Sequence, residues 1–110
     1  MRLERLQQVG TDNYMIENLN KVFESRVRLG IMSILMVNEW VEFKELKNLL
    51  KVTDGNLASH LAALEKKLLI EIHKEFVGKK PRTTYNATKQ GKELFNKHLE
   101  ALEALIKNKK

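Results

Sequence analysis

Apolar residues recur along much of the chain at the three- to four-residue spacing of an amphipathic helix. In the segment 26–37 one side of such a helix is formed by Val27, Ile31, Ile34 and Leu35. Ser25 precedes this segment, and its hydroxyl can cap the free N–H groups of the first turn. Asn38 follows it and is expected to mark its end. This pattern predicts a first long helix.

Two further helices follow at short intervals. The stretch "KELKNLL" at 44–50 predicts a two-turn helix that buries Leu46, Leu49 and Leu50. "KVTDG" then turns the chain, and Thr53 is a good N-cap. The third helix is predicted over about 54–68, because leucines recur at positions 57, 61, 64 and 68.

The outer face of this third helix is unusually small and polar. A surface helix normally carries charged residues on its outer face. Here that face holds Gly55, Asn56, Ser59, Ala62 and Ala63, with His60 beside them. Lysine appears only from Lys66 on. Either this face approaches a partner closely, or it is a sparsely decorated surface.

The apolar period then changes to two, which predicts strands. "IEIHKEF" at 70–76 places Ile70, Ile72 and Phe76 on one side. "GKKPR" at 78–82 predicts a hairpin tip, and 83–88 forms the returning strand. "WVEF" at 40–43 is a candidate for a very short strand. The expected fold class is therefore mainly α with a small β-hairpin.

A last helix is predicted over 89–107, with Thr88 as its N-cap. Four apolar residues in this helix are spaced by four, three and four positions, as in a heptad seam: Phe95, Leu99, Leu102 and Ile106. Leu94, Ala101 and Leu105 widen this seam beyond what one small core needs. Self-association through this helix is therefore expected, at Phe95, Leu99, Leu102, Leu105 and Ile106.

Composition fits one globular domain. The chain has 110 residues, of which 43% are apolar and 31% charged. No apolar run approaches the ~20 residues of a membrane span, and the first ten residues lack a secretion signal. There is no cysteine, which excludes a disulfide framework and a thiolate metal site. A cytoplasmic location is expected.

The net charge of +6 is unevenly placed. Between positions 78 and 92 the chain carries five basic residues and no acidic one. Such a stretch is the footprint of an anion-binding face, or a loop whose charge only keeps the protein soluble.

No catalytic or metal-binding motif accompanies this charge. A Gly-rich phosphate loop, a nucleophile elbow and a catalytic dyad are all missing. His60, His73 and His98 each stand without the partners of a metal site and are expected on the surface or in the seam. No enzyme, metal or cofactor is predicted.

In order and spacing, four stretches resemble a small single-domain winged-helix transcriptional regulator of the multiple-antibiotic-resistance and arsenical-repressor types. They are "SRVRLGIMSIL", "FKELKNLL", "VTDGNLASHLAALEKKLLI" and "KKPRTTYNATKQGKELFNKHLEAL". The resemblance implies a winged helix-turn-helix that binds double-stranded DNA and dimerises through N- and C-terminal helices. It covers 19–110, with 89–107 as the dimerisation helix. Residues 1–18 are an extension, expected to be helical and near the dimer interface.

The resemblance makes 54–68 the recognition helix, which enters the major groove with its N-terminal residues against base edges. Small side chains permit close approach, Asn56 and Ser59 can meet bases, and His60 can reach a base or a phosphate. The residues expected at the DNA are Thr53, Gly55, Asn56, Ser59, His60, Ala63 and Lys66.

The hairpin resembles the wing of this family. Lys79, Lys80 and Arg82 are expected to straddle phosphates, with Arg82 a candidate for the minor groove. Lys44 and Lys47 on the preceding helix are candidates for backbone contacts, although a solvated face fits them equally well. The alternative function is a winged-helix protein–protein interaction module without specific DNA binding. A small-molecule effector, if there is one, would bind at the dimer interface.

Overall fold

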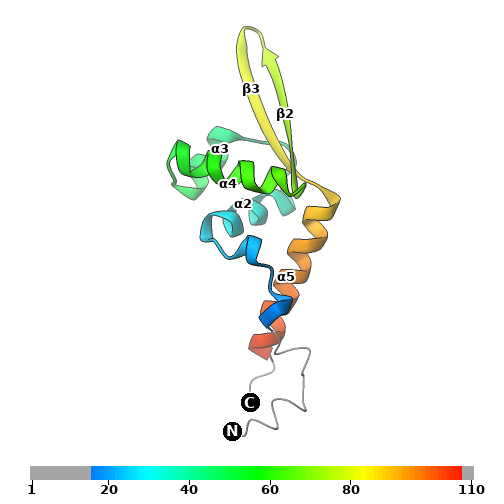
Figure 1. Ribbon diagram of the computed structural model, residues 1–110. Coiled ribbons are helices and arrows are strands. Elements are labelled where there is room, and N and C mark those ends of the chain that lie inside the picture. Colours follow the sequence, from blue (N-terminus) through cyan, green and yellow to red (C-terminus); the bar gives the residue numbers. More distant parts are fainter. Residues whose placement is uncertain (1–15, 108–110) are drawn as a thin grey trace, which may run out of the picture.

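The computed structural model describes residues 16–107, which form a mainly helical fold with one protruding hairpin (Figure 1). Two short 3-10 turns, η1 (Ile16–Asn18) and η2 (Lys21–Phe23), come first. The longer helices of this part are α2 (Arg26–Val37), α3 (Phe43–Leu50), α4 (Asp54–Lys66) and α5 (Lys89–Lys107). The strands are β1 (Val41–Glu42), β2 (Ile70–Val77) and β3 (Lys80–Ala87). The predicted fold class is confirmed.

Side-chain caps set the starts of α2, α4 and α5, as predicted. Ser25 and Thr53 each accept a hydrogen bond from the backbone N–H three residues on, at 3.3 and 3.2 Å. Thr88 does the same for α5 at 2.9 Å and also donates to the Leu68 carbonyl at 2.7 Å. Asn38 caps the end of α2. Each bond satisfies a backbone group that the helix end leaves free.

Helix α4 ends two residues earlier than predicted, at Lys66. Leu68 takes a left-handed backbone conformation (φ 62°) and its side chain is exposed. Leu69 is buried in its place. The predicted leucine stripe is therefore right for Leu57, Leu61 and Leu64 and wrong for Leu68, because the helix stops before the fourth position.

The three strands form an antiparallel sheet in the order β1-β3-β2. β2 and β3 pair from Ile70 opposite Ala87 to Val77 opposite Lys80. Only Gly78 and Lys79 remain for the tip, and Gly78 supplies its left-handed conformation (φ 67°). The predicted tip at 78–82 is thus too long: Pro81 and Arg82 lie inside β3.

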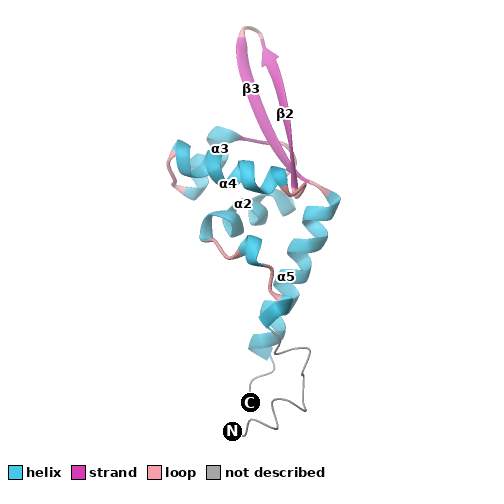
Figure 2. Cartoon of the chain, viewed as in Figure 1, coloured by secondary structure: helices cyan, strands magenta, loops and turns pink. Residues whose placement is uncertain are grey.

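The hairpin extends past the helices, with nothing but its own two strands at the far end (Figure 2). Phe76 was expected on the core side with Ile70 and Ile72, but it is 73% exposed. The alternation is correct, but the helical layer does not reach that far along β2. Leu49 was also expected inside and is exposed, because α3 turns only Leu46 fully into the core.

The core lies between α2, α3, α4, the base of the hairpin and the first turns of α5. Its largest fully buried side chains are Phe23, Phe95, Ile31, Met32, Leu35, Leu46, Leu57, Leu64, Leu69 and Ile70. Phe23 meets Phe95 edge-on, with ring centroids 5.1 Å apart. This contact attaches the segment before α2 to α5.

The extension at 1–18 lies almost wholly outside the described residues, and so does its predicted role near a dimer interface. Its last three residues form η1, a 3-10 turn. Among the described residues, no helix is both long and apolar enough to cross a membrane.

Candidate nucleic-acid interface

The outward face of α4 carries short side chains. Gly55, Asn56, Ser59 and Ala62 are exposed, and Ala63 is half-buried at the margin. Thr53 is also exposed, but its hydroxyl caps the helix by accepting from the Asn56 N–H. Lys66 lies exposed in the last turn. The structure therefore brings the predicted recognition residues onto one helix, with the small and polar ones on its N-terminal part.

Gly55 is not required by the packing of the protein. A Cβ placed on it would meet no atom within 4 Å, and its backbone has no positive φ. Gly91, on α5, differs: its Cβ would lie 2.0 Å from the Leu69 carbonyl oxygen. The absence of a side chain at Gly55 therefore keeps open a surface that faces outward.

His60 is oriented by an arginine from another helix. Nε of Arg28, on α2, donates to Nδ1 of His60 at 2.9 Å, and the same guanidinium donates to the Val22 carbonyl at 3.4 Å. Burial first, and then the charge of Arg28, lower the pKa of His60. The ring is therefore neutral near pH 7 and keeps its proton on Nε2, as a hydrogen-bond donor. Arg28 lies 32 positions away, and no spacing pattern in the sequence connects the two residues.

The two lysines of α3 differ in their surroundings. Lys44 is exposed at the start of the helix. Lys47 forms an ion pair with Asp54 in the first turn of α4, with 2.9 Å between Nζ and Oδ1. Both partners are substantially exposed, so the pair adds little stability. The pair does connect α3 to the start of α4, and it gives the charge of Lys47 a partner within the protein.

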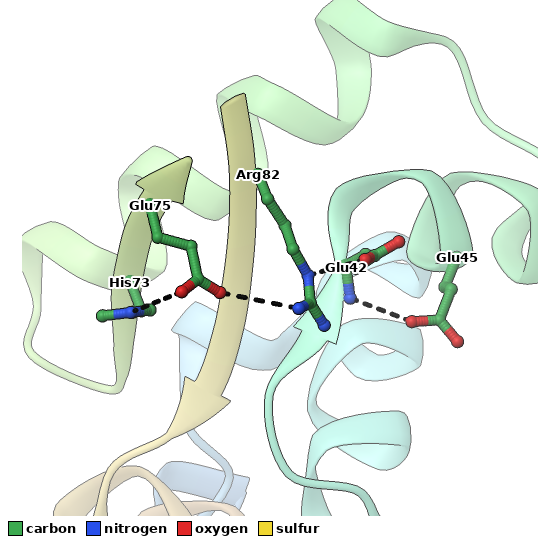
Figure 3. A network of polar contacts seen from close by, with 5 residues as sticks. All are labelled: Glu42, Glu45, His73, Glu75 and Arg82. Atoms are coloured by element: carbon green, nitrogen blue, oxygen red, sulfur yellow. Dashed lines mark hydrogen bonds and ion pairs between the residues drawn. The ribbon is translucent and has the colours of Figure 1, made fainter. Parts of the chain in front are cut away.

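Lys79 lies in the turn of the hairpin and Lys80 is the first residue of β3, and both are exposed. Arg82 does not extend outward with them. Its Nε lies 2.7 Å from Glu42 Oε2 and its Nη1 3.5 Å from Glu75 Oε2 (Figure 3). Two carboxylates therefore hold the guanidinium that was expected at a phosphate or in the minor groove. Glu42 lies 40 positions before Arg82 in the sequence, so no local signal indicates the pair.

The comparisons with known proteins agree with this geometry. A family model described as a winged helix DNA-binding domain matches residues 27–106. An uncharacterized protein of Methanocaldococcus jannaschii is 35% identical over 88 residues, 80% of this chain and 96% of that protein. A transcriptional regulator homologue from Pyrococcus horikoshii has a similar structure, with TM-score 0.69 and 32% identity over 83% of this chain and 95% of its own. MepR of S. aureus in complex with DNA shares the fold at 15% identity, with TM-score 0.69 over 94% of this chain and 85% of its own.

The chain belongs to the winged-helix DNA-binding domain family. In the terms of this family α3 and α4 are the helix-turn-helix, and the β2–β3 hairpin is the wing. Sequence similarity and fold together identify a DNA-binding transcription regulator.

In this winged-helix chain the predicted dimerisation residues separate into two groups. Phe95 is 1% exposed and packs against Phe23 in the core, so its assignment to a dimer contact is corrected. Leu99, Leu102 and Ile106 are exposed, and Leu105 is half-buried. The exposed apolar residues that remain for a partner therefore begin at Leu99, one helical turn later than predicted.

His98 was expected on the surface or in the seam, but it is only 4% exposed. Its Nδ1 accepts a hydrogen bond from the Asn20 N–H at 2.9 Å, and its ring lies near Phe23 and Phe95. Burial lowers its pKa, and the charge of Glu24 opposes that effect. His98 thus joins the segment before α2 to α5.

An open cavity of about 680 Å³ lies beside this junction, lined by 18–21 and by one side of α5 from Leu94 to Ala104. Within 16–107 no group of three or more His, Cys, Asp or Glu side chains is arranged to hold a metal ion.

Proposed function

We propose that the protein binds sequence-specific sites in double-stranded DNA as a homodimer. α4 would lie in the major groove and the wing against the neighbouring backbone. One observation carries the proposal: the outward face of α4 is short, polar and accessible, beside a hairpin that extends past the helices with lysines at its tip. The major groove, about 12 Å wide, admits an α-helix, and short side chains let the helix backbone approach the base edges closely.

The residues assigned to the interface follow from this placement. Asn56 and Ser59 meet base edges, and His60 donates from Nε2 to a base or a phosphate. Lys66, Lys79, Lys80 and Lys44 meet phosphates. Two α4 helices in a symmetric dimer would read half-sites about one helical turn apart, ~10 bp, or a multiple of it. A small-molecule effector, if the regulator has one, would enter beside α5, where the cavity lies.

The test is the affinity for random duplex DNA and for genomic fragments that copurify with the protein, measured over a range of salt concentrations. Random DNA should bind at low salt and lose affinity steeply as salt rises, because each neutralised phosphate contributes about 0.9 to the slope of log affinity against log salt. The copurified fragments should bind more tightly at every salt concentration. Absence of binding to both DNAs at low salt would contradict the proposal and support the protein-interaction module instead.

A further inference from the structure

Arg82 is at the centre of a network that joins all three strands of the sheet (Figure 3). It belongs to the central strand, β3, and its guanidinium contacts Glu42 of β1 at 2.7 Å and Glu75 of β2 at 3.5 Å. Glu75 is its register partner. The same Glu75 lies 3.7 Å from Nε2 of His73. One cation therefore holds a carboxylate from each neighbouring strand.

The contact between Arg82 and Glu42 matters because of where Arg82 lies along the hairpin. β1 has only two residues, which pair with Tyr85 and Thr84. Beyond Thr84 the hairpin consists of two strands alone, and an isolated two-stranded hairpin is marginally stable in water. Arg82 lies two residues nearer the tip than Thr84. Its contact with Glu42 therefore extends the support of β1 to the part of the hairpin that has no third strand.

Glu42 also belongs to the start of α3. It is the N-cap residue, its carboxylate accepts from the backbone at the third helical position, and its own N–H donates to Glu45 Oε1 at 3.1 Å. α3 is in turn joined to α4 by the pair between Lys47 and Asp54. Polar contacts thus join the wing to the start of α3, and a separate ion pair joins α3 to the first turn of α4.

The local charge indicates that Arg82 does not contact DNA. Two carboxylates surround one guanidinium, so the cluster of Arg82, Glu42 and Glu75 has no net positive charge to offer. A phosphate paired with Arg82 would compete with Glu42 and Glu75 for the guanidinium, and both carboxylates would lie close to the DNA backbone. The lysines at the tip, Lys79 and Lys80, have no such partners among the described residues.

We propose that Arg82 is a positioning residue, which fixes the angle of the wing relative to α3 and α4 and leaves the phosphate contacts to Lys79 and Lys80. The effect of Arg82 on DNA binding rests on the proposed function, whereas its effect on the angle of the wing does not. The spacing between recognition helix and wing must match the spacing between major groove and neighbouring backbone. A wing held by two carboxylates keeps that spacing before the DNA arrives and lowers the ordering cost of binding.

The structural part is tested without DNA. Backbone ¹⁵N relaxation of 74–81 reports hairpin motion on the picosecond to nanosecond timescale. Arg82→Gln, Arg82→Lys and Glu75→Gln should each increase the mobility of the hairpin. The lysine variant keeps the charge, but a single ammonium lacks the fork that bridges two carboxylates. Lys80→Gln removes a charge nearby and should leave the mobility unchanged. Equal mobility in Arg82→Gln and wild type would overturn the proposal.

The effect on DNA binding is tested by measuring the affinity for DNA over a range of salt concentrations. Lys80→Gln should lower the slope of log affinity against log salt by about 1 per half-site. Arg82→Gln should keep the wild-type slope while weakening specific binding about two- to fivefold, the range of a partly exposed ion-pair network. A slope lowered by Arg82→Gln as much as by Lys80→Gln would make Arg82 a phosphate contact and overturn the inference. If even the wild type fails to bind DNA, the proposed function is wrong, and hairpin mobility still decides whether Arg82 positions the wing.

Discussion

A substitution at Gly55 should change the stability of the fold and the affinity for DNA in opposite directions. A methyl group there enters open space, while it removes backbone freedom from the unfolded chain. Gly55→Ala should therefore raise the free energy of unfolding by about 0.5 kcal/mol. In the proposed complex the same methyl group lies against the DNA and should cost about 1 kcal/mol or more of specific affinity, as overpacking does. Urea unfolding and DNA titration measure the two effects.

Gly91→Ala is the matched control for Gly55→Ala. Its methyl group would meet the Leu69 carbonyl oxygen at 2.0 Å, so backbone has to move. It should destabilise the fold by about 1–3 kcal/mol. A Gly55→Ala protein that is stabilised and binds DNA with unchanged affinity would show that α4 does not approach DNA at this residue.

His98 predicts a pH dependence of stability. Burial lowers its pKa below the ordinary 6.5 in the folded protein. The unfolded chain therefore binds more protons in the window below about pH 6.5, and the free energy of unfolding falls as pH falls through that window. Protonation would also remove the Nδ1 lone pair that accepts from Asn20. This contribution is fully present above about pH 7.

His98→Gln is the variant that isolates this contribution. Wild type and variant are compared by urea unfolding near pH 5 and near pH 7.5, so that other titrating groups act equally on both. The stability advantage of wild type should be larger at the higher pH. An advantage that is the same at both pH values would mean that His98 does not titrate differently in the folded and unfolded states.

At the scale of elements, the sequence predicts the helices, strands and caps because these depend on local spacing. Ser25, Thr53 and Thr88 were recognisable as caps from their positions before apolar periods. The errors arise where a local pattern continues past its support. Phe76 keeps the alternation of β2 after the helical layer has ended, and Leu68 keeps the leucine spacing after α4 has stopped.

The candidate site shows the same limit more clearly. The small face of α4 and the lysines of the wing tip were found because each is contiguous in sequence. The role of Arg82 was not predicted from the sequence. Glu42 and Glu75 reach Arg82 only after β3 has paired with both neighbouring strands. Arg28 and His60 are a second example, since α2 and α4 must pack before their side chains meet. Charges counted along a sequence therefore overstate those available to a ligand.

At the scale of the whole molecule, the far part of α5 has apolar side chains that the described residues leave uncovered. Leu99, Leu102 and Ile106 are 42%, 36% and 69% exposed, along one side of the helix. Contiguous exposed apolar surface of this kind marks an interaction site. It lies far from the wing and α4, at the opposite end of the described chain (Figure 1). A dimer formed there would leave both recognition surfaces free.

Leu99→Glu combined with Leu102→Glu tests this assembly. We expect wild type to be a dimer at micromolar concentration and the double variant to be a monomer, as measured by light scattering. The monomer should bind an isolated half-site with unchanged affinity but a full operator much more weakly, because the second half-site is no longer bound at high effective concentration. Val37→Glu, which charges an exposed apolar residue at the end of α2, should remain dimeric. A monomeric wild type would remove the stripe from the interface, and a double variant that loses half-site binding too would indicate damage to the fold rather than to the dimer.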